Sequence, residues 1–157
     1  MNLDDLVNSG LIPTAAKQSL APVAARYAVA VSSTIAELLA NEGEPLARQF
    51  LPSDAELLTL PEERADPIGD NAHSPVEGIV HRHKDRVLFK PVSVCPVYCR
   101  FCFRREMLGD ATLSTEAMDR AFAYIADHDE IWEVILTGGD PFILSPRRAE
   151  EITQRLA

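Results

Sequence analysis

All three cysteines of this 157-residue chain lie within eight consecutive positions, in the stretch SVCPVYCRFCFRR. Their spacing is Cys95-x-x-x-Cys99-x-x-Cys102. Three cysteines cannot all pair with one another, and thiols this close together serve poorly as links between distant parts of a core, so a disulfide scaffold is not expected. A loop with such short separations can instead curl around one inorganic centre, with each sulfur pointing inward.

Three kinds of site remain open for these thiols. A structural zinc site needs four ligands, and the fourth would have to be His81 or His83, more than ten residues upstream. A redox pair made of Cys99 and Cys102 would leave Cys95 without a role. An iron-sulfur cluster held by three thiolates uses all of them and leaves one iron open to a substrate or cofactor. The aromatic residues between the cysteines would shield such a cluster from water.

Composition narrows the class of protein. With 15 basic and 24 acidic residues the net charge is -9, which argues against a nucleic-acid-binding protein. The N-terminus, MNLDDLVNSG, lacks the basic and apolar segments of a secretory signal, and the longest apolar stretch, 27–39, is too short to span a bilayer. We therefore expect a soluble, cytoplasmic protein with no membrane partner. An apolar content of 46% predicts a globular state.

Residues 1–80 are predicted to form an N-terminal helical and wrapping region. Helix is expected from about 4 to 40, with a break at 11–13 and an alanine-rich, helix-compatible run over 24–39. From Gly43 onward, prolines and glycines become frequent. They predict a segment that wraps over other parts of the chain and forms no core of its own.

Residues 81–157 are predicted to be α/β. The expected order is a strand at 86–94 that Pro91 would interrupt, the cysteine loop, a helix capped by Ser114, a strand at 131–137 and a helix capped by Ser145. This alternation is typical of parallel βα units joined by right-handed crossovers. Two such units do not complete a sheet, and no terminator follows the last helix, so we expect the fold to continue past Ala157.

Three stretches resemble one family: RQFLPSDAEL, DPIGDNAHSPVEGIVHRHKDRVLFKPVSVCPVYCRFCFRREMLG and ILTGGDPFIL. The cysteine spacing, with an aromatic residue before the last cysteine, resembles the cluster loop of radical S-adenosylmethionine (SAM) enzymes. The TGGDP segment resembles their glycine-rich SAM-binding motif. Together the stretches resemble the lysine 2,3-aminomutase family, strongly over about 48–144. The resemblance implies that 81–157 is the start of a partial TIM-type barrel, apparently truncated.

The resemblance also implies a set of site residues. Cys95, Cys99 and Cys102 would hold a [4Fe-4S] cluster, at which SAM is split to give a 5'-deoxyadenosyl radical. Arg104 would bind the substrate carboxylate, a task that suits a guanidinium fork. The implied cofactor-binding residues are Phe101, Gly138, Gly139, Asp140, Pro141 and Arg86, the last of them near pyridoxal phosphate. The plainer alternatives are an ordinary turn for the glycines and surface positions for the arginines.

The chain departs from the family pattern in two places. His83 stands where a tyrosine is usual, and none of the three lysines, Lys17, Lys84 and Lys90, matches the family's Schiff-base lysine. We therefore expect the isolated chain to be inactive. His73 and His81 have no assigned chemistry, so a structural hydrogen bond is expected for each.

The implied function is that of a radical SAM, pyridoxal-phosphate-dependent 2,3-aminomutase, which moves an amino group from C2 to C3 of lysine or a related amino acid. Its partners would be that amino acid and an electron donor such as flavodoxin or ferredoxin, and a homo-oligomer is compatible with the sequence. Two alternatives remain: a radical SAM protein of the same lineage with another reaction, and a non-catalytic zinc-binding module.

Overall fold

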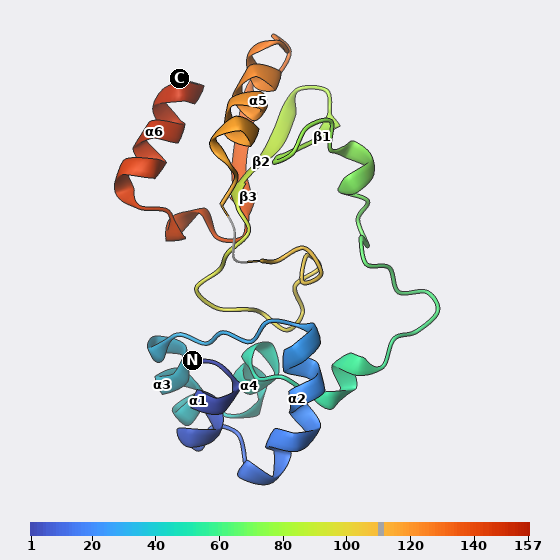
Figure 1. The fold of residues 1–157 in the computed structure, drawn as a ribbon, viewed down its shortest axis with the longest axis vertical. Coiled ribbons are helices and arrows are strands. Elements are labelled where there is room, and N and C mark those ends of the chain that lie inside the picture. The colour runs from blue at the N-terminus through green and yellow to red at the C-terminus, as the bar shows by residue number, and fades with distance from the viewer. Residues whose placement is uncertain (110–111) are drawn as a thin grey trace. The chain divides into compact units, whose positions relative to one another are not determined.

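The structure is a computed structural model that describes residues 1–109 and 112–157 (Figure 1). The chain divides into two compact units. The first consists of Met1–Pro67 and Pro96–Met107, and the second of Ile68–Cys95 and Leu108–Ala157. The chain passes from one unit to the other inside the cysteine loop, so Cys95 belongs to the second unit and the other two cysteines to the first.

The first unit is built from short helices around an aliphatic core. Its core contains Leu6, Val23 and Val31, each almost fully buried. The helices are α1 (Leu3–Asn8), α2 (Lys17–Arg26), α3 (Ser33–Glu42) and α4 (Glu44–Phe50), with 3-10 turns η1 (Thr14–Ala16) and η2 (Asp54–Leu57). These helices are too short to be stable alone in water, so their stability comes from packing their apolar faces together.

The predicted helical run over 24–39 is wrong in its middle. Helix α2 ends at Arg26, Tyr27 is extended, and α3 begins only after Ser32, whose hydroxyl accepts a hydrogen bond from the Ile35 amide at 3.3 Å. The break lets Tyr27 and Val31 bury their side chains to 3% and 1% exposure. Tertiary burial therefore overrides the helix propensity of this stretch.

The wrapping segment also contains a helix that the sequence interpretation missed. Helix α4 starts directly after Gly43, and Pro45 occupies its first turn, where proline costs no backbone hydrogen bond. Pro45 was counted as a breaker, but at this position it favours the start of a helix.

The second unit is α/β, as predicted. Its sheet contains β1 (Ile79–His83), β2 (Arg86–Val92) and β3 (Glu133–Gly138) in the order β1-β2-β3. Strands β2 and β3 are parallel and are joined through α5 (Thr115–Ala126), and α6 (Pro146–Leu156) follows β3. The predicted caps are confirmed, because the Ser114 and Ser145 hydroxyls accept hydrogen bonds from the amides of Ala117 and Arg148.

Strand β1 was missed. It pairs antiparallel with β2 through a tight turn, so the first strand of the sheet is half of a hairpin. The sequence signal was a short apolar-to-polar run, IVHRH, followed by the turn residues Lys84 and Asp85. Pro91 disturbs the ladder as predicted, since the β2–β3 register is irregular between Phe89 and Val92.

Helices α5 and α6 share one core with the sheet. Phe89 of β2 is fully buried, and its ring meets that of Phe122 of α5 edge to face, with centroids 5.3 Å apart. Ile152 of α6 is fully buried in the same core. Among the described residues, no helix is both long and apolar enough to cross a membrane.

Candidate metal and cofactor site

The cysteine loop in the first unit is a series of tight turns. The Cys102 amide donates to the Cys99 carbonyl at 3.1 Å, and the Arg105 amide donates to the Cys102 carbonyl at 3.1 Å. None of the three cysteines, all within the described residues, forms a disulfide, and each is of intermediate burial. Burial and then the negative charge of Cys102 raise the pKa of the Cys99 thiol. The two thiols are therefore close enough to repel each other as thiolates, which a shared cation would relieve.

Backbone hydrogen bonds tie this loop to the helical part of the same unit. The Tyr98 amide donates to the Ala30 carbonyl at 2.9 Å, and the Arg100 amide donates to the Gln49 carbonyl at 2.7 Å. The break between α2 and α3 thus has a second role, because it exposes the Ala30 carbonyl that the loop uses.

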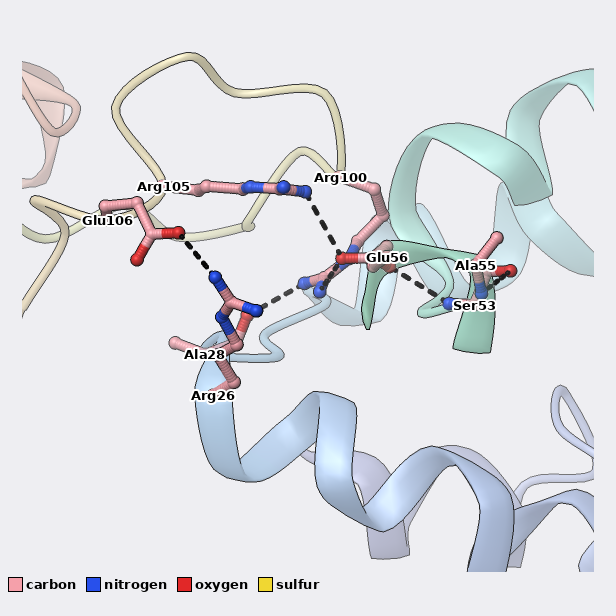
Figure 2. Close-up of polar contacts among 8 residues, drawn as sticks. All are labelled: Arg26, Ala28, Ser53, Ala55, Glu56, Arg100, Arg105 and Glu106. Carbon is pink, nitrogen blue, oxygen red and sulfur yellow. Dashed lines mark hydrogen bonds and ion pairs between the residues drawn. The ribbon is translucent and has the colours of Figure 1, made fainter. Parts of the chain in front are cut away.

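A buried ion pair adds a side-chain anchor (Figure 2). Nε and Nη2 of Arg100 donate to the two carboxylate oxygens of Glu56 at 3.0 and 2.7 Å, and Nη1 donates to the Ala28 carbonyl at 2.8 Å. The Arg100 side chain is only 7% exposed and that of Glu56 11%. Sequence analysis missed this pair, because the partners are 44 positions apart and no local pattern joins them.

Arg105, next to the loop, lies over an aromatic ring. Its guanidinium is 4.3 Å from the ring centroid of Tyr27 and its Nη1 is 3.8 Å from Oε2 of Glu56. The guanidinium of Arg26 also lies over the Tyr27 ring. Arg26 forms an ion pair with Glu106 at 3.5 Å (Figure 2). Burial raises the pKa of the Tyr27 hydroxyl, although the charge of Arg105 opposes this. A pocket of about 470 Å³ is lined by Arg26, Tyr27, Arg105 and Glu106 and also reaches Cys102.

The predicted glycine motif lies at the end of β3 in the second unit. The Gly139 amide donates to the Val92 carbonyl at 2.7 Å, and the Asp140 amide donates to the Val94 carbonyl at 2.9 Å. Gly138 has a φ of +115°, and a Cβ on either glycine would collide with a backbone carbonyl of 92–94. The glycines are therefore required for close backbone approach to the segment that leads into Cys95.

The other residues of this motif form a short turn. The Asp140 carboxylate caps η4 (Pro141–Ile143) by accepting a hydrogen bond from the Phe142 amide at 2.9 Å. Since the Gly139 and Asp140 amides are both used within the unit, neither is free to bind a ligand.

Arg86 lies at the other end of the sheet from the glycine motif. It is the first residue of β2 and pairs in register with Glu133, whereas Gly138 pairs with Val92 at the last residue of the strand. Its guanidinium donates to both Asp85 oxygens at 3.0 and 3.1 Å and is 3.4 Å from a Glu133 oxygen. The structure does not bring Arg86 together with the glycine motif.

Two predicted residues of the cysteine loop are exposed or stacked. Phe101 is 70% exposed, and the Arg104 guanidinium lies 4.6 Å from the ring centroid of Phe103.

His81, in the second unit, has the expected structural hydrogen bond, which joins its Nδ1 to the Tyr124 hydroxyl at 2.6 Å.

The donor set fits an iron-sulfur cluster in kind, because three half-buried thiols that form no disulfide occur at short spacing in a loop. Within residues 1–109 and 112–157, no three side chains of His, Cys, Asp or Glu are grouped so as to hold a metal ion. The thiols themselves are divided between the two units.

Several known proteins that are similar to this chain are named L-lysine 2,3-aminomutase. The chain is 35% identical over 118 residues to an L-lysine 2,3-aminomutase of Acetoanaerobium sticklandii, which is 74% of this chain and 28% of that protein. It is 38% identical over 104 residues to one of Methanococcus maripaludis, and 31% identical over 149 residues to a putative one of Aquifex aeolicus. These matches cover 65% and 93% of this chain, and 24% and 39% of the two relatives.

These relatives confirm the resemblance to the lysine 2,3-aminomutase family. The chain spans about a quarter to two fifths of the length of the curated relatives that it matches. A comparison with models of protein families found none that matches the chain.

Proposed function

We propose that the chain is part of a radical SAM enzyme of the lysine 2,3-aminomutase type. The observation that carries the proposal is the Cys95-x-x-x-Cys99-x-x-Cys102 loop, whose cysteines form no disulfide, in a chain related to proteins of that name. In the proposed reaction an amino group moves from C2 to C3 of lysine or a related amino acid. We further propose that 81–157 forms the beginning of a TIM-type barrel.

In this proposal the thiolates of Cys95, Cys99 and Cys102 would hold a [4Fe-4S] cluster to which SAM binds. The cluster, SAM and pyridoxal phosphate would supply the one-electron and amino-transfer chemistry when bound. The protein positions these groups and excludes water. Phe101, beside the last cysteine, would cover the cluster, and Arg104 would bind the substrate carboxylate through its guanidinium fork.

We propose a more limited role in SAM binding for the glycine motif than the resemblance implied. The Gly139 and Asp140 amides already bond to the backbone of 92–94, so the motif would act on SAM through its carbonyl groups and Pro141 and by holding the segment before Cys95. Arg86 remains a predicted pyridoxal phosphate contact, although Asp85 and Glu133 already neutralise its charge. An electron donor of the flavodoxin or ferredoxin kind, a cytoplasmic location and self-association belong to the same proposal.

Iron content tests the proposal directly. The chain is purified without oxygen, reconstituted with iron and sulfide, and analysed for iron, sulfide and colour. We expect a brown protein with about four irons per chain, as a [4Fe-4S] cluster requires. Replacing all three cysteines by alanine should abolish iron binding, and Cys99→Ala alone should reduce it strongly.

The same preparation separates the alternative of a zinc module. A colourless protein with one zinc per chain would overturn the proposal and favour a structural zinc site. Iron that is retained equally well by the triple alanine variant would also overturn it, because the metal would then be bound elsewhere.

A further inference from the structure

One member of the Arg100–Glu56 pair, Arg100, lies within the cysteine loop, and the other, Glu56, lies in η2. Arg100 is the residue directly after Cys99 and two residues before Cys102. Its backbone amide donates to the Gln49 carbonyl at 2.7 Å, and three nitrogens of its guanidinium donate to Glu56 and to the Ala28 carbonyl. Both the backbone and the side chain at this position are therefore fixed.

Glu56 is equally well fixed on its own side. Its Oε1 accepts from the Ser53 amide at 3.0 Å as well as from Arg100, so the carboxylate belongs to the N-terminal cap of η2 (Figure 2). The other oxygen, Oε2, accepts a hydrogen bond from Nη2 of Arg100 at 2.7 Å and lies 3.8 Å from Nη1 of Arg105. One carboxylate thus accepts hydrogen bonds from Arg100 and forms a longer ion pair with Arg105, and these two arginines lie on either side of Cys102 in the sequence.

Removing the carboxylate charge would leave both arginines without this counterion. Arg100 is 9% exposed, so its guanidinium has little access to water while the loop keeps this geometry. A buried guanidinium without its carboxylate is strongly unfavourable, and the nearest way to relieve it is local opening of the turn.

We propose that Glu56 and Arg100 are positioning residues that hold the Cys99–Cys102 turn in one geometry before metal arrives. Glu56 acts through Arg100 and Arg105 and touches no thiol. The proposal rests on the proposed function only where it assigns the thiols as cluster ligands, because the anchoring itself belongs to the metal-free chain.

The test measures thiol reactivity and iron retention in the same variants of the 157-residue chain. Iodoacetamide alkylation of metal-free protein is followed for each cysteine by peptide mass spectrometry, and Cys95, in the other unit, is the internal reference. Iron retention is measured after reconstitution as the rate of loss to a chelator. The variants are Glu56→Gln and the double variant Glu56→Gln/Arg100→Met, in which no unpaired buried charge remains.

A matched control comes from the exposed pair Glu44 and Arg48 in the same unit, joined within α4. Glu44→Gln and Arg48→Met change charge in the same way without touching the loop. We expect both Glu56 variants to alkylate Cys99 and Cys102 at least about fivefold faster than the native chain, since opening of the turn is easier. Iron loss should be faster by a similar factor, and the controls should behave like the native chain.

The double variant separates positioning from folding. Because it leaves no buried charge unpaired, its thermal unfolding should be close to that of the native chain, while its thiols remain reactive. Native alkylation rates and native iron retention in both Glu56 variants would overturn the inference. So would a double variant in which stability, thiol reactivity and iron retention all return to native values.

The two proposals fail differently. If the native chain takes up no iron, the proposed function fails, while the alkylation rates still decide whether the pair positions the turn. If the native chain takes up iron and both Glu56 variants match it in uptake, retention and alkylation, the proposed function stands and this inference fails.

Discussion

The first unit adds a buried ion pair to the backbone hydrogen bonds that hold its part of the cysteine loop, whereas the second unit holds the segment before Cys95 through backbone hydrogen bonds from Gly139 and Asp140. In the first unit a buried guanidinium and carboxylate, Arg100 and Glu56, make the anchor. In the second, the amides of Gly139 and Asp140 extend the parallel ladder onto 92–94. The difference teaches that neighbouring stretches of one cysteine loop can be positioned by a buried ion pair in one unit and by the absence of a Cβ in the other.

Each kind of anchor has its own weakness. A charge-based anchor tolerates small changes of shape but not the loss of one partner. A backbone anchor is independent of charge and salt, but it does not tolerate a side chain where the two backbones touch. Changes in the second unit should therefore act through packing, and those in the first through charge and capping.

The largest loss of stability is expected from a substitution in the core of the second unit. Phe89→Ala removes a fully buried ring that contacts Phe122, and it should lower the free energy of unfolding by about 3–5 kcal/mol. Urea denaturation followed by circular dichroism measures this. Ile135→Ala in β3, where the side chain is 39% exposed, should cost less than about 1 kcal/mol. Equal losses would show that the sheet has no single buried face.

The backbone anchor itself is tested by a single methyl group. Gly139→Ala places a Cβ against the Val94 backbone and should cost about 2–3 kcal/mol through overpacking. Gly69→Ala in the same unit is the matched control: its φ is +72° but no atom lies within 4 Å of the added Cβ. It should cost about 1 kcal/mol from backbone strain alone. If Gly139→Ala cost no more than the control, close approach would not be what requires this glycine.

In the first unit, the boundary between α2 and α3 is tested through its cap. Ser32→Ala removes the hydroxyl that accepts from the Ile35 amide and should cost about 1 kcal/mol in thermal or urea unfolding. Ser33→Ala, one residue later and exposed at the first helical position, should be nearly neutral or slightly stabilising. The opposite order of the two losses would contradict the observed helix start.

The smallest effect on stability is expected from protonation of Asp85, which depends on pH. Arg86 first, and then Trp132, hold the pKa of the Asp85 carboxyl well below its usual range. Because the folded-state pKa is lowered, this group stabilises the fold above the usual aspartate pKa of about 4, and the contribution declines as pH falls from there toward the folded-state value.

Trp132 is the only tryptophan of the chain and donates its Nε1 hydrogen to Asp85 at 2.9 Å, so its fluorescence reports on this carboxylate. The emission should remain constant as pH falls through about 4 and change only at lower pH. Asp85→Asn should remove the change. A midpoint near 4 in the native chain would show that the ion pair does not form in solution.

Local signals in the sequence predicted the second unit well. The caps at Ser114 and Ser145, the apolar face of α5 and the disturbance at Pro91 depend on neighbours within a few positions, so they could be found by inspection. Strand β1 was missed because its pattern is short and its evidence is the partner strand. The extended Tyr27 was missed because the gain from burying its ring is a tertiary effect.

The sequence by itself determined the chemical groups available to this protein: three closely spaced thiols, two glycines after a strand and a relationship to the aminomutases. Only the tertiary structure decided how these groups are held. The Glu56–Arg100 pair spans 44 positions, and the glycines are explained by a strand end that another segment approaches. Propensity and capping act between neighbours along the chain, whereas ion pairing and steric exclusion depend on distances that exist only after folding.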